Sequence, residues 1–199
     1  MVEGRHIRFE HHHSLHSEDR QRTQPAEPLV ELLLADGVRV VADVGVGTGY
    51  FALPLAERLA EGKVLGLDIE PRMLEVLRQR AREKGLEQRL VAVEMTDPHT
   101  LPVADRTLDA ALMVSLYHEL DDRPRFLAEL GRALRPGGLL AVADWRPEGT
   151  ADHGPRPQHR VPVDVVLREL ASAGFEHLET HQVYQDHWVV TGRAPDPSS

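Results

Sequence analysis

The stretch of residues 38–57, VRVVADVGVGTGYFALPLAE, indicates the class of fold. It opens with a nearly continuous apolar run over 38–44, which is typical of a short strand buried on both faces of a parallel sheet. Gly45, Gly47 and Gly49 follow, and they permit a tight turn in which a ligand can touch the backbone. A helical pattern over 50–61 comes next, and free N–H groups at the start of that helix would favour an anionic group in the turn.

The rest of the chain repeats this alternation of strand and helix. It therefore predicts an α/β fold with a doubly wound parallel sheet. The last two apolar runs are too close together for a helical crossover, so they must pair as an antiparallel hairpin. The expected strands are 38–44, 64–67, 90–93, 108–114, 139–143, 175–184 and 186–191, and the expected helices are 25–37, 50–61, 71–85, 123–134 and 163–173.

Length and composition limit the class of protein. A chain of 199 residues, 41% of them hydrophobic, can bury the core of one domain, and without cysteine it has no disulfides, thiolate metal sites or cysteine nucleophiles. No run approaches the ~20 apolar residues that span a bilayer, and the polar N-terminus does not resemble a signal sequence. We therefore expect a cytoplasmic protein with no membrane partner. The 32 acidic and 23 basic residues give a formal charge of -9, which repels polyphosphate and disfavours nucleic acid as a partner.

The first 24 residues differ in composition from the rest of the chain. They have no apolar period, so 1–24 is expected to be a polar, His-rich arm or surface helix that could fold over a site. Residues 25–193 are expected to form a single domain, and 194–199 a frayed tail. His12 and His16 lie one helical turn apart and could share a divalent ion, but no carboxylate-histidine spacing supports this, and we expect no metal site. The histidines of this segment are His6, His11, His12, His13 and His16.

An acidic residue after the second expected strand strengthens the case for a ligand site in the glycine turn. Asp68 lies 25 residues after Asp43, at a strand end where a carboxylate can accept from both hydroxyls of a ribose. One alternative is a purely structural turn, with Asp68 as a solvated strand end. Another is a nicotinamide-binding fold, whose fingerprint is G-x-G-x-x-G, but here Tyr50 stands at the third glycine position.

Four separated segments together resemble a known family. They are VADVGVGTGYFALPLAE (41–57), VLGLDIEPRMLE (64–75), TDPHTLPVADRTLDAALM (96–113) and LRPGGLLAVADW (134–145). In order and spacing they resemble the motifs of class I S-adenosylmethionine-dependent methyltransferases, over about residues 25–192. The resemblance implies a seven-stranded Rossmann-like sheet of order 3-2-1-4-5-7-6 with its last strand antiparallel. The pattern D-W-R…G-P…H-R further resembles a subgroup of small bacterial and archaeal methyltransferases of unknown acceptor.

The resemblance also implies which residues hold S-adenosylmethionine (SAM). Asp68 would hold the ribose hydroxyls, Ile69 would lie against the adenine, and Asp97 would accept from the adenine amino group. Thr96 departs from the glycine that is usual at its position. The full set of implied cofactor-binding residues is Asp43, Gly45, Gly47 and Gly49 around the methionine part, together with Asp68, Ile69, Thr96, Asp97, Pro98 and Met113.

Candidate catalytic residues follow the fourth and fifth strands, because open α/β sheets bind ligands at the carboxyl ends of their strands. His118 can act as a base near neutral pH, and Tyr117 could face the sulfonium. We expect His118, Asp144 and His159 to face one cavity and to orient or deprotonate the acceptor, with the loop over 146–162 closing on the site. The alternatives are that Tyr117 and His118 only cap a turn, and that the loop is solvated.

The acceptor class follows from two absences. The N-P-P-[YF] motif that binds a flipped base or a glutamine amide in the family is replaced by M-V-S-L at 113–116, and no cysteine is present to capture arsenite. We therefore expect methyl transfer from SAM to a small molecule, by a chain that could form a homodimer. A non-catalytic SAM-binding module and a nicotinamide-dependent oxidoreductase are the alternatives.

Overall fold

Seven strands form one sheet of order β3-β2-β1-β4-β5-β7-β6 in the computed structural model, which describes residues 9–34, 37–59, 61–149 and 154–195. Neighbouring strands are parallel except for the antiparallel pairs β5-β7 and β6-β7. The predicted doubly wound fold, its strand order and its C-terminal hairpin are confirmed. The strands are β1 Val40–Val44, β2 Lys63–Asp68, β3 Leu90–Glu94, β4 Leu108–Val114, β5 Leu134–Trp145, β6 Glu176–His181 and β7 His187–Arg193.

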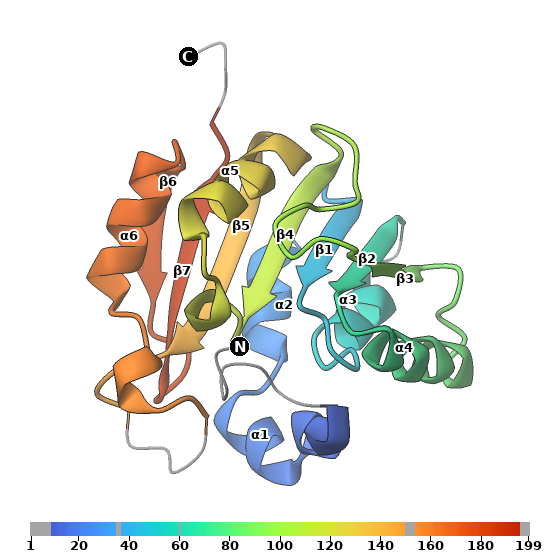
Figure 1. Ribbon diagram of the computed structural model, residues 1–199. Helices are drawn as coiled ribbons and strands as arrows, with labels where there is room; N and C mark the ends of the chain where they lie inside the picture. Colours follow the sequence, from blue (N-terminus) through green and yellow to red (C-terminus); the bar gives the residue numbers. More distant parts are fainter. Residues whose placement is uncertain (1–8, 35–36, 60, 150–153, 196–199) are drawn as a thin grey trace.

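Helices cover both faces of the sheet (Figure 1). Apolar side chains of α2, α3 and α4 pack with one set of strand residues, and those of α5 and α6 pack with the alternate set. This two-sided burial explains why the central strands read as continuous apolar runs. The helices are η1 Phe9–His16, α1 Glu18–Thr23, α2 Glu27–Leu33, α3 Ala52–Arg58, α4 Pro71–Glu83, η2 Tyr117–Glu119, α5 Arg123–Ala133, η3 Pro157–His159 and α6 Val163–Ser172.

The fifth strand is longer than the expected 139–143. It runs from Leu134 to Trp145, because the backbone after α5 continues directly into the sheet, where Leu134 pairs with Leu108 across an irregularity in the register. The extension at the other end includes Asp144 within the strand, opposite Trp188 of β7. A strand residue has a fixed direction, so the Asp144 carboxylate is held more rigidly than a loop residue would be.

The carboxyl ends of the central strands meet at one edge of the sheet. Val44 pairs with Leu67 on one side and with Met113 on the other. In Figure 1 the N-terminal segment with η1 and α1 lies against this same edge, beneath the strand tips. Among the described helices, none combines the length and the apolar character that a membrane crossing needs.

Candidate functional site

The glycine turn after β1 is built from the backbone. The N–H groups of Gly45 and Val46 both donate to the carbonyl of Leu67, at 2.8 and 3.0 Å, which ties the turn to the end of β2. Gly45 has φ 73° and Gly47 has φ 52°, values in the left-handed region that favours glycine. The turn therefore presents backbone rather than side chains at the strand ends.

Asp68, the last residue of β2, lies beside this turn. Its Oδ2 accepts from the Gly47 N–H at 2.7 Å and its Oδ1 accepts from the Glu70 N–H at 2.9 Å. Burial raises the pKa of the carboxyl, and the backbone hydrogen bonds from Glu70 and Gly47 oppose that shift. The neighbouring Ile69 is 52% exposed, which is unusual for a large apolar side chain at a strand end. A carboxylate next to an open apolar surface can bind a ribose and its attached base.

Asp43 lies deeper, within β1, and is almost fully buried. Burial is the largest influence on it and raises its pKa to about 7, with a further upward contribution from Asp68. The opposite charge of Arg20 lowers the pKa of Asp43 and is the main influence against burial. A buried carboxyl next to a guanidinium is well suited to a ligand that carries a positive and a negative group together.

Arg20 comes from the N-terminal segment, which the structure folds over the site. Its guanidinium lies 4.5 Å from the centroid of the Tyr50 ring, and its Nη1 donates to the Leu15 carbonyl at 3.2 Å. Its Nε donates to the side chain of Gln24 at 3.0 Å. The polar N-terminal segment thus contributes a half-buried cation to the glycine turn. No sequence pattern singles out Arg20, since it is one of several charged residues in the segment.

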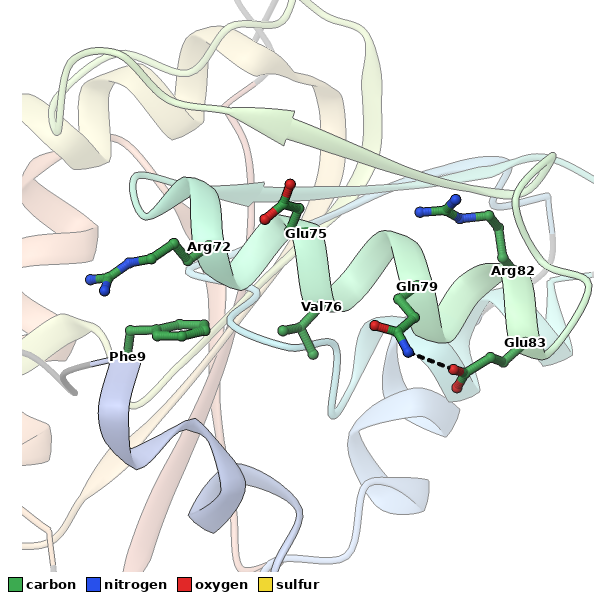
Figure 2. Close-up of a pocket in the computed structure, with 7 residues that line it drawn as sticks. All are labelled: Phe9, Arg72, Glu75, Val76, Gln79, Arg82 and Glu83. Carbon is green, nitrogen blue, oxygen red and sulfur yellow. Dashed lines mark hydrogen bonds between the residues drawn. The ribbon is translucent and has the colours of Figure 1, made fainter.

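A second contact holds the N-terminal segment at the start of α4 (Figure 2). The Arg72 guanidinium lies 4.6 Å from the centroid of the Phe9 ring, and its Nη1 is 3.5 Å from Glu10. The same two residues, Phe9 and Arg72, form one end of a hollow of about 710 Å³ along α4. Figure 2 shows mostly polar and charged side chains along the rest of this hollow, including the hydrogen-bonded Gln79 and Glu83, with the apolar Val76 among them.

The main cavity, of about 1000 Å³, lies between the strand ends and the N-terminal segment. This volume is at the upper end of the roughly 300–1,000 Å³ that is usual for ligand sites. Residues from β1, β2, β4, α4 and the N-terminal segment contribute to its wall. The wall consists of Phe9, Glu10, Leu15, Arg20, Asp43, Gly45, Val46, Gly47, Thr48, Tyr50, Phe51, Asp68, Ile69, Glu70, Arg72, Met73, Met95, Pro98, His99, Val114, Ser115, Leu116, Glu119, Leu120, Asp121 and Phe126.

Six of the ten residues expected to hold the cofactor lie in this wall, and four do not. Gly49 packs toward Leu77 of α4, and Met113 is fully buried in the core cluster beneath α5 and α6. Thr96 is exposed to solvent and does not line the cavity. Asp97 does not line it either, and its carboxylate accepts from the His99 N–H at 2.7 Å. The six that line the cavity are Asp43, Gly45, Gly47, Asp68, Ile69 and Pro98.

Beyond β4, the structure brings together two of the three expected catalytic residues. His118 Nδ1 lies 2.8 Å from Asp144 Oδ1, and the His118 N–H donates to Asp144 Oδ2 at 3.0 Å. Asp144 also accepts from the Trp145 N–H at 2.7 Å. Both side chains are buried and lie outside the cavity wall, where Glu119 is found instead. The sequence predicts a catalytic role for His118 and Asp144 but none for Glu119, whose side chain lines the cavity in front of them.

Tyr117 and His159 lie away from the cavity wall. The Tyr117 hydroxyl donates to Glu169 of α6, and its ring packs edge-on against Trp188. Burial and the Glu169 carboxylate raise the pKa of Tyr117. His159 ends η3, and none of the hydrogen bonds found within the described parts of the chain joins it to His118 or Asp144. Tyr117 is therefore a core residue, contrary to the expectation that it could face the sulfonium.

The N-terminal histidines fall largely outside the described structure. His6 lies before its first residue, and nothing is described of the side chains of His11, His12 and His13. His16 packs edge-on against Tyr50, and burial together with the charges of Arg80 and Arg20 lowers its pKa to about 4. The absence of a metal site stays a prediction.

Comparison with known proteins agrees with this geometry. The model of a family described as a methyltransferase domain matches residues 42–142, from β1 to β5. The chain belongs to this methyltransferase family. The resemblance to class I SAM-dependent methyltransferases is thereby confirmed, and the family implies the use of SAM.

Individual relatives in the methyltransferase family share both sequence and structure with the chain. Methyltransferase GfsG of Streptomyces halstedii is 38% identical over 63% of this chain and 45% of that protein. Demethylmenaquinone methyltransferase of Deinococcus radiodurans is 36% identical over 61% of this chain and 49% of that protein. The chain therefore spans about half the length of these curated relatives. The crystal structure of a SAM-dependent methyltransferase from Aquifex aeolicus is 26% identical, with a TM-score of 0.85, and covers 95% of this chain and 100% of that chain.

Proposed function

We propose that the chain binds SAM in the main cavity and transfers its methyl group to a small-molecule acceptor. The observation that carries this proposal is the Asp68 carboxylate at the end of β2, held by the Gly47 and Glu70 N–H groups and facing a cavity with room for a second ligand. The family membership of the chain supports the same activity. A nicotinamide cofactor has no support from the family match, and the turn lacks the spacing for its pyrophosphate.

The nucleoside end of the cofactor fits the wall near β2 and β3. Asp68 would accept from the ribose hydroxyls through the lone pairs that its two backbone hydrogen bonds leave over. Ile69 and Pro98 would cover the adenine, because both line the cavity and Ile69 is open to it. The glycine turn leaves the space that a Cβ would take, since an atom added to Gly47 would meet only Leu15, at 3.1 Å.

The amino-acid end of the cofactor fits the pair formed by Asp43 and Arg20. An α-amino acid group carries an ammonium and a carboxylate on one carbon, and this end of the cavity offers one carboxyl and one guanidinium. We propose that Asp43 accepts from the ammonium and Arg20 donates to the carboxylate. The pairing would bring Asp43 into its ionised form, because an ammonium lowers the pKa of a neighbouring carboxyl.

When bound, SAM supplies a methyl group that is already activated on a sulfonium, so the chain has little covalent chemistry to perform. The residues of the cavity wall hold both ligands in line and exclude water, which is the main requirement for such a transfer. Phe9 and Leu15 of the N-terminal segment line the cavity, and in the proposed complex they would help to exclude water from it. His118 and Asp144 are proposed as positioning residues behind the wall, and His159 keeps its predicted role as a further candidate.

Binding of the product S-adenosylhomocysteine (SAH) and turnover test this proposal. At 100 times its dissociation constant, SAH should raise the stability of the fold by about 2.7 kcal/mol, and NAD should leave the melting temperature unchanged. With methyl-labelled SAM and a small-molecule extract, the chain should release SAH and label the extract. Retention of SAM without release would favour a binding module, and a thermal shift by NAD alone would contradict the proposal. The cytoplasmic location, the homodimer and the absence of a nucleic-acid partner stay predictions.

A further inference from the structure

One end of the main cavity is acidic and carries no arginine or lysine. The wall residues there lie between β4 and η2, in η2, and in the segment that follows η2. Of the cations among the described wall residues, Arg72 is paired with Glu70 and Glu10, and Arg20 lies by Asp43. His99, which also lines the cavity, lies with its Nε2 3.4 Å from Asp121, and no arginine or lysine among the described wall residues at this end would pair with an anionic acceptor. The wall residues of this end are Ser115, Leu116, Glu119, Leu120 and Asp121.

Glu119 is the buried acid of this end. Its side chain is only 9% exposed, and its Oε1 lies 3.8 Å from His118 Nε2. The other ring nitrogen, Nδ1, lies 2.8 Å from the Asp144 carboxylate, whose side chain is 1% exposed. Because Nδ1 is held at the Asp144 carboxylate, the opposite ring nitrogen, Nε2, is directed to the Glu119 side. The three side chains form a row from the core to the cavity, with Glu119 at the cavity.

The surroundings of Glu119 favour proton exchange near neutral pH. Burial raises the pKa of its carboxyl to about 8, with smaller upward contributions from Asp144 and Asp68 and a downward one from His118. His118 belongs to η2, Asp144 to β5 and Asp68 to β2. A group that titrates close to the working pH is well matched to general acid and base catalysis.

We propose that Glu119 is a catalytic residue, which receives the proton of a neutral, protic acceptor such as a phenolic hydroxyl or an uncharged amine. His118 and Asp144 act as positioning residues behind it. In the step, a bond forms between the acceptor heteroatom and the methyl carbon, the carbon–sulfur bond breaks with its electron pair left on sulfur, and the acceptor proton moves to a Glu119 oxygen. This inference rests on the proposed methyl transfer and specifies the acceptor class and the base.

The acceptor class is tested with four chemical probes and SAM labelled in its methyl group. The probes are catechol, aniline as an uncharged amine, a fatty carboxylate and an alkyl phosphate. We expect label in catechol, in the amine or in both, and none in the carboxylate or the phosphate. Preferential labelling of either anion would overturn the proposal, and so would the absence of label in all four probes when SAH is bound.

The role of Glu119 is tested with Glu119→Gln. It should lower kcat for the accepted probe by about 100-fold or more, the scale of general-base catalysis, while the Kd for SAH changes by less than about threefold. In the wild type, kcat should rise with pH as Glu119 loses its proton near pH 8, and this rise should be absent from Glu119→Gln. Glu83→Gln, on the exposed face of α4, is the matched control and should leave both kcat and the pH profile unchanged.

Two further variants keep the test open if Glu119→Gln does not fold. Glu119→Asp should keep the rise of kcat with pH at a lower rate, because the carboxyl remains but is drawn back from the acceptor. His118→Gln should move that rise to higher pH, because His118 lowers the pKa of Glu119, and a purely structural role would not shift the profile. Full activity of folded Glu119→Gln with an unchanged pH profile would refute the inference and leave the proposed function intact. Failure of the wild type to bind SAH would refute the proposed function itself.

Discussion

The two ends of the main cavity are built by different means. At the cofactor end, the positions depend on backbone: a glycine turn, its hydrogen bonds to Leu67 and the carboxylate of Asp68. At the acceptor end, they depend on side chains from η2 and the residues on either side of it, among them Glu119 and Asp121. A backbone turn leaves a glycine pattern in the sequence, whereas a side chain brought from a distant segment leaves no local pattern. The difference accounts for which parts of the site could be predicted.

The largest expected effect at the cofactor end is that of Asp68→Ala. It should weaken SAH binding by about 100-fold, because two hydrogen bonds between an ionised carboxylate and the ribose would be lost. Asp97→Ala should weaken it by less than about threefold, since that exposed side chain lies outside the cavity wall and can offer one screened contact. Isothermal titration calorimetry with SAH measures both. Equal losses would contradict the ranking of the ribose contact of Asp68 above the adenine contact of Asp97.

The fold could be predicted from the sequence almost completely, for physical reasons. Buried parallel strands must be apolar on both faces, so β1 and β4 stand out as runs, and Pro71 and Gly85 mark the limits of α4. The early start of β5 could not be predicted, because Pro136-Gly137-Gly138 is a typical end of a helix and gives no sign that the backbone continues into a sheet. That extension places Asp144 inside the strand.

The site could be predicted only where it is local. The glycine turn, Asp68 and Ile69 follow from contiguous residues, and His118 with Asp144 follows from two adjacent strand ends. The place of Arg20 in the site could not be predicted. Its contact with Tyr50 joins two segments that are far apart in the sequence, and no motif links them. Glu119 could not be distinguished from the neighbouring His118 as a cavity residue. The two are adjacent in one short 3-10 helix, and the sequence does not show which of them lines the cavity.

The second largest effect separates two glycines of the same turn. Gly49→Ala should lower the free energy of unfolding by about 2 kcal/mol, because φ is 89° there and the added methyl would collide with Leu77. Gly47→Ala should cost less stability, since its methyl would meet the flexible end of Leu15, but it should weaken SAH binding more. Urea unfolding and calorimetry on both variants check this. A larger loss of stability in Gly47→Ala would contradict the division of roles.

A smaller effect is expected from the N-terminal segment. Arg20→Gln should weaken SAH binding by about tenfold, the value of one charge-assisted hydrogen bond to the carboxylate. Methylthioadenosine, which lacks the amino-acid group, should bind the variant and the wild type equally. Arg22→Gln, on the exposed side of α1 where it pairs with Asp19, is the control. An equal loss for both ligands would show that Arg20 acts by holding the segment in place and not by binding the cofactor.

The smallest expected effect concerns the stability of the ligand-free chain. The pKa of Asp43 is raised to about 7 by burial, so the folded state holds a proton that the unfolded state releases near pH 4. Stability from this group is present in full at low pH and is lost as the pH rises to about 7. Asp43→Asn removes this loss, so its stability relative to the wild type should rise by at least about 1 kcal/mol between pH 5 and pH 7.

Urea unfolding at pH 5, 6, 7 and 8 measures this gain, with Asp164→Asn on the surface of α6 as the control that should follow the wild type. The same Asp43→Asn variant should bind SAH more weakly, because an amide cannot pair with the ammonium as a carboxylate does. A residue that destabilises the empty site and strengthens the filled one would show that the cofactor end is organised for its ligand at the expense of stability. Parallel pH curves for Asp43→Asn and the wild type would instead mean that Asp43 is already ionised in the empty cavity, paired with Arg20 before the cofactor arrives.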